Sequence, residues 1–248
     1  MTTYHLTAPG AEFVGDLQQG SAEERVWRSR SIAPSDIAAV MGRSPYQPRE
    51  DLLHRKATGA SRPPLLRPEQ PGLGWDKQDE LAEVFAAEHP QYDVVRTGYW
   101  RSTQRPWQRC WPHRVLIPAG HDFASGPAPI LATLTFRTTP EPLDAVGWGP
   151  GAIAAVPGHI NDATQWLLDA LGNEVSYVMA YSKHGDETRT YLIHRDDAHI
   201  TTLREAAQAF LAEVDEERRK LDIQAHASME ATEPGFTDRW QKDITLGD

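Results

Sequence analysis

Arg28 and Ser35 are residues whose types suit the binding of a phosphate group. Ser35 precedes the segment DIAAVMG, an apolar run closed by a glycine, so the pattern predicts a short helix that begins at this serine. Free N–H groups at a helix N-terminus favour an anion, and arginine offers a fork of donors to phosphate oxygens. The same residues allow a structural interpretation, in which Ser35 only caps the helix and Arg28 pairs with Glu24 or Asp36.

A second group of side chains could hold a metal ion or a base. His113, His121 and Asp122 offer nitrogen and oxygen ligands for a transition metal, although histidine and aspartate on a loop are usually only solvated. Tryptophans could stack on nucleobases, but large aromatics at strand ends and on helix faces more often supply packing. The tryptophans in question are Trp75, Trp100, Trp107, Trp111, Trp148 and Trp166.

Regular apolar spacing predicts the elements that position these side chains. The expected helices cover 35–42, 49–57, 75–88, 159–171 and 197–221, and the expected extended segments cover 92–100, 113–117, 130–136, 175–182 and 188–195. This order indicates an α/β sandwich, in which helices flank a central mixed sheet. The proline-rich stretch 61–72 is typical of a loop. The charge run 215–220 (DEERRK) is typical of a solvated helix face.

Length and composition favour one globular domain. The 248 residues are 40% hydrophobic, enough for one substantial core. We expect an N-terminal extension over 1–20, a domain over 21–223, and a tail over 224–248 that is flexible or dependent on a partner. No stretch is apolar enough for a membrane span, and no basic segment followed by an apolar one opens the chain, so a cytoplasmic location is expected. Cys110, the single cysteine, is expected to be a buried, inert thiol.

Charge is distributed unevenly along the chain. The formal net charge is −10, which argues against a protein that coats nucleic acid through its overall field. Residues 1–114 hold 15 of the 25 basic and 14 of the 35 acidic residues, which leaves a net −11 in the remainder. Any contact with nucleic acid should therefore use the N-terminal half, because phosphate binding depends on local neutralisation by Lys and Arg.

The segment RSRSIAPSDIAAVMGRSPY (28–46) resembles the opening signature of the YqaJ-type viral recombinases, the lambda-exonuclease branch of the PD-(D/E)xK nuclease fold. The resemblance continues through VVRTGYW, WPHRVL, LTFRTT, VPGH, QWLLDALG and TYLIHRDD, and it covers about residues 21–221. Ser31 and Pro34 depart from the pattern. The resemblance implies a restriction-endonuclease-like sandwich, and it assigns Arg28 and Ser35 to contacts with a terminal 5′-phosphate.

In that family carboxylates hold Mg²⁺ or Mn²⁺, and a lysine assists the attacking water. Carried over by position, the helix carboxylate falls on Gln78, the hairpin aspartate on His113, and the Glu-x-Lys pair on Thr135 and Arg137. The Tyr-x-x-Gln of the next helix falls on Ile160 and Ala163, whereas Gln165 is retained. None of the substituted side chains supplies an anionic ligand, and arginine stays protonated. A different register would make Asp79, Glu80 or Asp122 the ligand instead.

The sequence therefore predicts a catalytically degenerate member of this fold that needs no cofactor. Arg28, Ser35, Arg109, Arg114 and Arg137 are its expected phosphate contacts. It would bind DNA or regulate recombination, repair or defence of phage-related origin, with a homo-oligomer or a recombination protein as possible partners. Two alternatives stay open: an active Mg²⁺- or Mn²⁺-dependent exonuclease, and an interaction scaffold that does not bind DNA.

Overall fold

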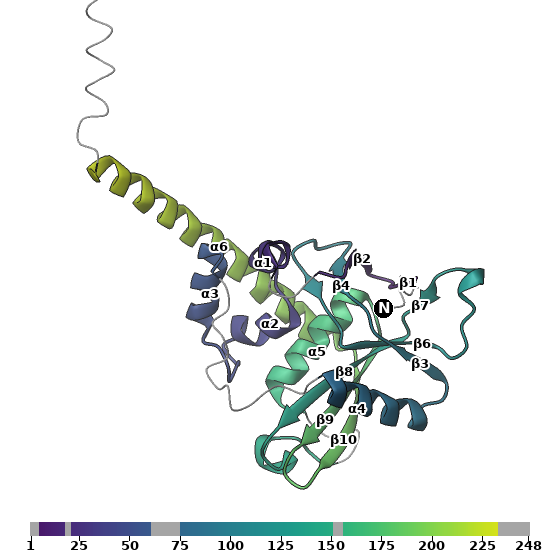
Figure 1. The fold of residues 1–248 in the computed structure, drawn as a ribbon. Helices are drawn as coiled ribbons and strands as arrows, with labels where there is room; N and C mark the ends of the chain where they lie inside the picture. Colours follow the sequence, from purple (N-terminus) through teal and green to yellow (C-terminus); the bar gives the residue numbers. More distant parts are fainter. Residues whose placement is uncertain (1–4, 18–20, 61–74, 151–155, 233–248) are drawn as a thin grey trace, which may run out of the picture.

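A five-stranded mixed sheet forms the centre of the computed structural model, which describes residues 5–17, 21–60, 75–150 and 156–232 (Figure 1). The strand order is β10-β9-β8-β6-β3, and only the β8–β9 pair is parallel. The strands are β3 (Tyr92–Val95), β6 (Arg114–Pro118), β8 (Ala132–Thr139), β9 (Val175–Ser182) and β10 (Glu187–His194). The expected class, a mixed sheet flanked by helices, is confirmed.

Alternation along β8 gives the sheet two different faces. Leu134 and Phe136 pack with Phe85 of helix α4 (Trp75–Glu88) in one apolar cluster. Thr135 and Arg137 point to the other face, because successive side chains of a strand alternate. That second face lies under helix α5 (Gly158–Leu171). The chemistry-bearing side chains of β8 therefore lie between the sheet and α5.

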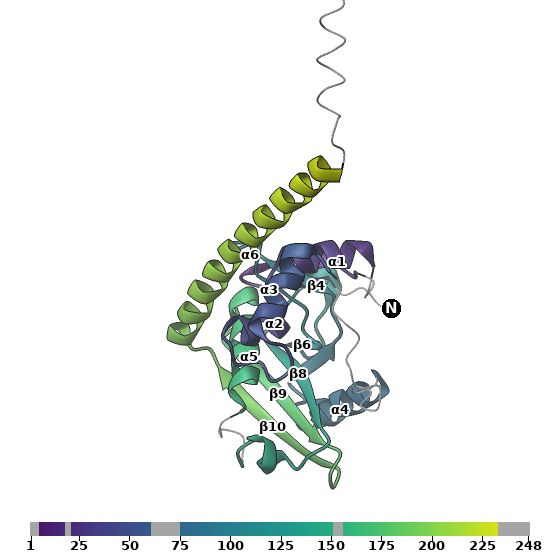
Figure 2. The same ribbon diagram turned by 90° about the vertical axis from the view of Figure 1, so that its left-hand side faces the viewer.

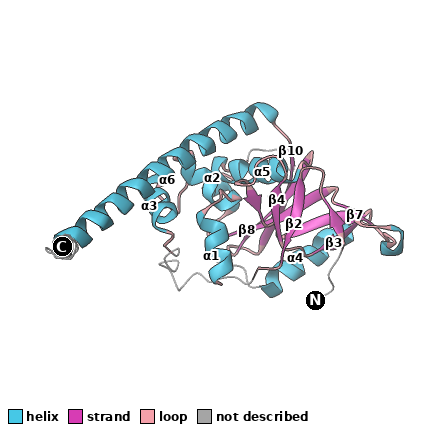
Figure 3. Cartoon of the chain, turned by 90° about the horizontal axis from the view of Figure 1, so that it is seen from above, coloured by secondary structure: helices cyan, strands magenta, loops and turns pink. Residues whose placement is uncertain are grey.

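A layer of helices packs on α5 and closes this side of the molecule (Figure 2). It consists of α2 (Pro34–Val40), α3 (Arg49–Thr58) and α6 (Asp197–Thr232). Fully buried Ile37, Leu52, Trp166 and Phe210 form one cluster across these helices. Figure 3 shows α1 (Ala22–Ser29), α2, α3 and α6 gathered on one side of the strands. This layer holds the predicted phosphate-binding segment 28–35 against α5.

The N-terminal stretch contains two strands that the sequence did not predict. Strand β1 (Leu6–Thr7) pairs with β7 (Ala128–Pro129), and β2 (Ala11–Gly15) joins β4 (Tyr99–Ser102) and β5 (Arg109–Cys110) in a separate sheet. The sequence predicted no strand in the extension 1–20, so β1 and β2 were missed. Ala11 is buried in the main core, and the Phe13 ring packs on Trp100, so this short stretch gains burial from residues distant in sequence.

The C-terminal helix and the segment 92–100 also differ from prediction. Helix α6 continues to Thr232, beyond the expected boundary at 223, because no Gly or Pro interrupts the helix before Pro234. Its end extends away from the body (Figure 1), and residues 233–248 lie outside the described chain. Segment 92–100 forms two strands of different sheets. Gly98 lies between them, where a Cβ atom would come within 2.4 Å of the Gly15 carbonyl oxygen.

The remaining predictions concern single features. The short 3-10 helices η1 (Phe123–Ser125) and η2 (Leu143–Val146), like α1, were not predicted. Cys110 is fully buried, as expected, and burial raises the pKa of its thiol. The predicted loop 61–72 lies outside the described residues. Among the described helices, none is both long and apolar enough to cross a membrane.

Candidate functional site

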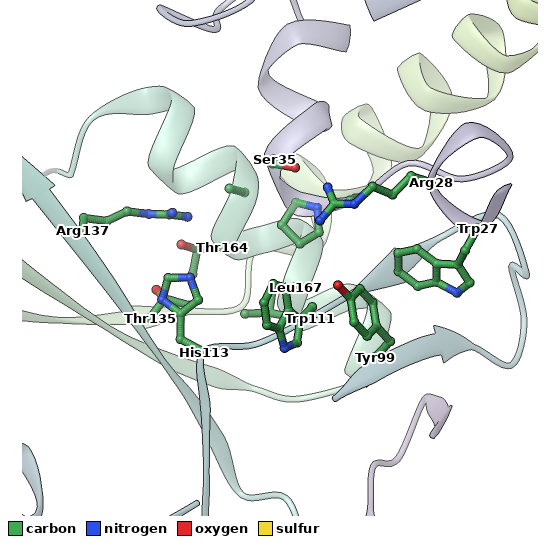
Figure 4. A pocket seen from close by; sticks show the side chains of 13 residues that line it. Trp27, Arg28, Ser35, Tyr99, Trp111, His113, Thr135, Arg137, Thr164 and Leu167 are labelled. Atoms are coloured by element: carbon green, nitrogen blue, oxygen red, sulfur yellow. The ribbon is translucent and has the colours of Figure 1, made fainter. Parts of the chain in front are cut away.

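A cavity of about 220 Å³ lies between the sheet, α5 and the segment that joins α1 to α2 (Figure 4). Elements far apart in the sequence meet there. The predicted site residues Arg28, Ser35, His113, Thr135, Arg137 and Ala163 all line it. Arg28 and Arg137 reach toward its interior from opposite sides (Figure 4). The structure thus brings the two guanidinium groups to one cavity.

Arg28 lies on α1 and forms an ion pair through Nε with Glu24, one turn earlier. The Glu24 side chain is almost fully buried, and Tyr99 donates its hydroxyl to the same carboxylate at 3.5 Å. Of the two acidic partners considered for Arg28, the structure shows Glu24 and not Asp36. Arg28 nevertheless lines the cavity. Glu24 therefore positions Arg28 at the cavity edge.

Ser35 does not cap α2, so that prediction is wrong. The helix begins one residue earlier, at Pro34, because proline suits the first helical position. Ala33 is the N-cap, and its N–H donates to the Asp36 carboxylate at 3.3 Å. Ser35 is the second residue of the helix, exposed and on the cavity wall. Its hydroxyl is thereby available to the cavity.

A buried lysine, which the sequence did not reveal, holds this segment in place. Lys56 of α3 is 1% exposed, and its ammonium donates to the carbonyls of Arg28 (2.7 Å) and Ser31 (2.5 Å) and to the Asp36 carboxylate (2.7 Å). Burial disfavours the charged carboxylate of Asp36, but the adjacent Lys56 and Arg55 cations hold its pKa below the ordinary value. The pair fixes the backbone that carries both Arg28 and Ser35.

His113 precedes β6 and has a defined protonation state. Burial and the nearby cations Arg137 and Arg114 lower its pKa to about 3, so the ring is neutral at physiological pH. The backbone N–H of Phe136 donates to its Nδ1 at 3.0 Å. The single ring proton must then be on Nε2. His113 is thus a hydrogen-bond donor toward the cavity, with no lone pair on Nε2 for a metal.

Thr135 and Arg137 of β8 contribute polar atoms without protein partners. The Thr135 hydroxyl and the Arg137 Nε are buried and have no hydrogen-bond partner among the described residues. Burial lowers the pKa of Arg137, but a guanidinium still remains protonated. No ion pair of Arg137 occurs within the described part of the chain. A partly buried cation without a counter-ion is unfavourable, so an anionic ligand would stabilise this wall.

The described residues do not fit a divalent metal. Mg²⁺ and Mn²⁺ require anionic oxygen ligands, and the cavity lining contains no Asp or Glu. Nearby carboxylates are already paired, Asp36 with Lys56 and Asp162 with Arg43 and His199. In the described ranges, no group of three His, Cys, Asp or Glu side chains comes together. The chemistry of the lining instead suits phosphate oxygens.

Several sequence candidates lie away from the cavity. Arg114 directly follows His113 but points to the opposite face of the sheet, where it pairs with Asp79 of α4. Asp79 also pairs with Arg96, and Glu80 pairs with Lys77 at the surface. Gln78, on the same helix, is not part of the lining. Arg114 is therefore corrected from a phosphate contact to a structural partner of α4.

Asp122, an alternative metal ligand in the sequence, and Arg109, an expected phosphate contact, also have structural roles. Asp122 caps η1 by accepting the Ala124 N–H at 2.9 Å, beyond the end of β6 that is opposite His113. His121, beside it, contacts the Gly126 carbonyl at 3.1 Å. Arg109 packs its guanidinium 4.9 Å from the centre of the Trp27 ring and donates to the Trp27 carbonyl. Neither Asp122 nor Arg109 lines the cavity.

The family resemblance selected three positions on α5, Ile160, Ala163 and Gln165. Of these, only Ala163 lines the cavity. Ile160 is buried in an apolar cluster with Val178 and Tyr191. The retained Gln165 donates to the His194 carbonyl at 2.8 Å and accepts the Asp196 N–H at 2.9 Å. Gln165 thus holds the β10–α6 connection, and its amide is used by the fold.

Aromatic side chains line the end of the cavity opposite Arg137 (Figure 4). Tyr99 stacks on Trp111 with ring centroids 5.1 Å apart, and Trp27 meets Tyr99 edge to face at 4.9 Å. The expectation that most tryptophans are core residues is confirmed for Trp100, Trp148 and Trp166. The sequence suggested Trp111 as a possible base contact, but Trp27 carried no signal beyond its proximity to Arg28.

The fold is an α/β sandwich, in which a mixed sheet and α5 line the cavity. Among solved structures, the chain is similar to an alkaline exonuclease from Laribacter hongkongensis, with a TM-score of 0.61 and 16% identity over 84% of this chain and 99% of that one. The same exonuclease in complex with dAMP gives a TM-score of 0.58, 16% identity, and coverage of 83% and 99%. No protein-family model and no curated protein matches the chain. The shared feature is the fold.

Proposed function

We propose that this protein is a catalytically degenerate relative of the exonuclease fold that holds a DNA phosphate in its cavity without cutting the strand. One observation carries the proposal. Arg137 is partly buried, has no acidic partner in the described chain, and faces Arg28 across a cavity whose lining has no carboxylate. A phosphate group would supply the missing negative charge.

The donor set favours binding over hydrolysis. Arg28, Arg137 and the Nε2–H of neutral His113 all donate hydrogen bonds, as anionic phosphate oxygens require. The hydroxyls of Ser35 and Thr135 add two further donors. No group of this set accepts a proton from water near pH 7, because arginine stays protonated and Nδ1 of His113 is occupied by a backbone N–H. Binding would therefore be independent of a metal, and the P–O bond would stay intact.

The wider role is proposed on the sequence resemblance and the exonuclease fold. A DNA-end-holding or regulatory protein of the YqaJ type, acting in phage-related recombination, repair or defence, accounts for both. A second copy or a recombination protein is a plausible partner by the same resemblance. The acidic surface expected from the C-terminal half would then face that partner and not the DNA.

Binding measurements in EDTA test the proposal. We expect the protein to bind a 5′-phosphorylated linear duplex, with an affinity that falls steeply as salt rises, because phosphate contacts release counterions. Arg28→Ala and Arg137→Ala should each weaken binding. Arg219→Ala is the matched control, since Arg219 is exposed on α6 and paired with Glu216. No binding in EDTA, or a loss in the control equal to that in Arg137→Ala, would contradict the proposal.

A further inference from the structure

Tyr46 is an exposed aromatic residue that the phosphate cavity does not use. It lies in the loop between α2 and α3 and does not line the cavity. Its side chain is 72% exposed, the largest value among the exposed large hydrophobic residues that the structure describes. Single exposed apolar residues are common on protein surfaces, so exposure alone assigns no role. The position and the support of the ring are what distinguish it.

The ring lies just outside the cavity, at the N-terminal end of α5. Tyr46 contacts His159 edge to face, with ring centroids 5.8 Å apart. His159, Ala163 and Leu167 are spaced by four along α5 and so share one face of the helix, and Ala163 and Leu167 line the cavity. Burial and the positive charge of Arg137 lower the pKa of His159, which places that guanidinium near the same end. Tyr46 thus lies beside His159, one helical turn from the cavity-lining Ala163.

The loop that carries Tyr46 is held rigidly. The Ser44 hydroxyl accepts the backbone N–H groups of Tyr46 and Gln47, both at 3.2 Å. Arg43 binds the buried Asp162 carboxylate through two hydrogen bonds, of 3.0 and 2.7 Å. Arg55 donates to the Gln47 side chain at 3.1 Å. An aromatic ring on such a fixed backbone loses little conformational entropy when a ligand stacks on it.

We propose that Tyr46, with His159 at its edge, stacks the nucleobase adjacent to the phosphate held between Arg28 and Arg137. The inference rests on the proposed function and specifies its ligand. A base that stacks on a protein ring has left the duplex stack, so the ligand is single-stranded DNA or a frayed duplex end. Because every base presents an aromatic face, the site would bind bases with little sequence preference.

Two oligonucleotides separate the base contact from the phosphate contact. One is a short 5′-phosphorylated single strand, and the other has the same backbone with abasic residues in place of its nucleotides. Affinities are measured by fluorescence anisotropy in EDTA. We expect Tyr46→Leu to bind the base-containing strand roughly 5- to 150-fold more weakly and the abasic strand unchanged. Tyr46→Phe should keep the original preference, because it retains the ring.

Phe123→Leu is the matched control, since Phe123 is an exposed aromatic of η1 beyond the distal end of β6. It should bind both strands as the unmodified protein does. Equal binding of the two strands by the unmodified protein, or an equal loss for both in Tyr46→Leu, would overturn this inference and leave the phosphate site standing. Failure of the unmodified protein to bind either strand would overturn the proposed function and this inference together.

Discussion

Replacement of Arg137 by methionine should change stability and DNA affinity in opposite directions. The substitution keeps much of the side-chain volume but removes a partly buried cation whose buried Nε has no hydrogen-bond partner within the described residues. Removal of an unsatisfied buried polar group favours folding by about 1–3 kcal/mol. The lost charged hydrogen bonds to phosphate should cost about 1.5–3 kcal/mol, or roughly 10- to 150-fold in affinity.

Urea unfolding and anisotropy titrations in EDTA measure the two effects separately. In a plot of log affinity against log salt concentration, the slope should also decrease in magnitude by about one, because one phosphate contact is lost. Arg114→Met is the control on the other face of the sheet, where the lost partner is Asp79. That variant should be destabilised and should bind DNA normally. If Arg137→Met instead loses stability and binds DNA with unchanged affinity, Arg137 is a structural residue and the reasoning fails.

Three further predictions concern the same site. Because the folded-state pKa of His113 is depressed to about 3, protonation favours the unfolded state, and stability should be lost as pH falls below about 6.5, by up to about 1.4 kcal/mol per pH unit. His113→Gln should flatten that slope in urea titrations between about pH 6.5 and 5, and an unchanged slope would refute the assignment. Affinity for an unphosphorylated strand, whose phosphodiesters keep their charge, should stay nearly flat across that range, whereas a steep rise toward low pH would indicate that His113 becomes charged. Lys56→Met should cost about 3–5 kcal/mol in urea unfolding, because the buried Asp36 carboxylate keeps only Arg55 as an ion-pair partner, at 3.3 Å, and Lys56→Met combined with Asp36→Leu should recover part of that loss. A double variant no more stable than the single one would contradict this.

Local patterns predicted the central elements because these are long and have clear apolar spacing. Helix 75–88 and strand 175–182 have the predicted bounds, and the two-residue period of β8 explains how Thr135 and Arg137 reach one face. The N-terminal strands were missed because their burial comes from Trp100 and the main core, which no local pattern reveals.

The sequence predicted which residues form the site better than it predicted their orientation and their neighbours. Sequence resemblance selected Arg28, Ser35, His113, Thr135 and Arg137, and these side chains meet at one cavity. It could not separate His113 from its neighbour Arg114, because the face to which each side chain points depends on where β6 begins. Nor could it show the buried Lys56, whose partners are the Asp36 carboxylate and two backbone carbonyls, 20, 25 and 28 residues away.

The most direct measurement compares an end-labelled, 5′-phosphorylated linear duplex with the protein in EDTA and in Mn²⁺, on native and denaturing gels. The account predicts a shifted native band of the same affinity in both conditions and full-length strands throughout. Strands that shorten only in Mn²⁺ would contradict it and favour an active exonuclease. Intact strands with no shifted band in either condition would also contradict it and favour a scaffold that does not bind DNA.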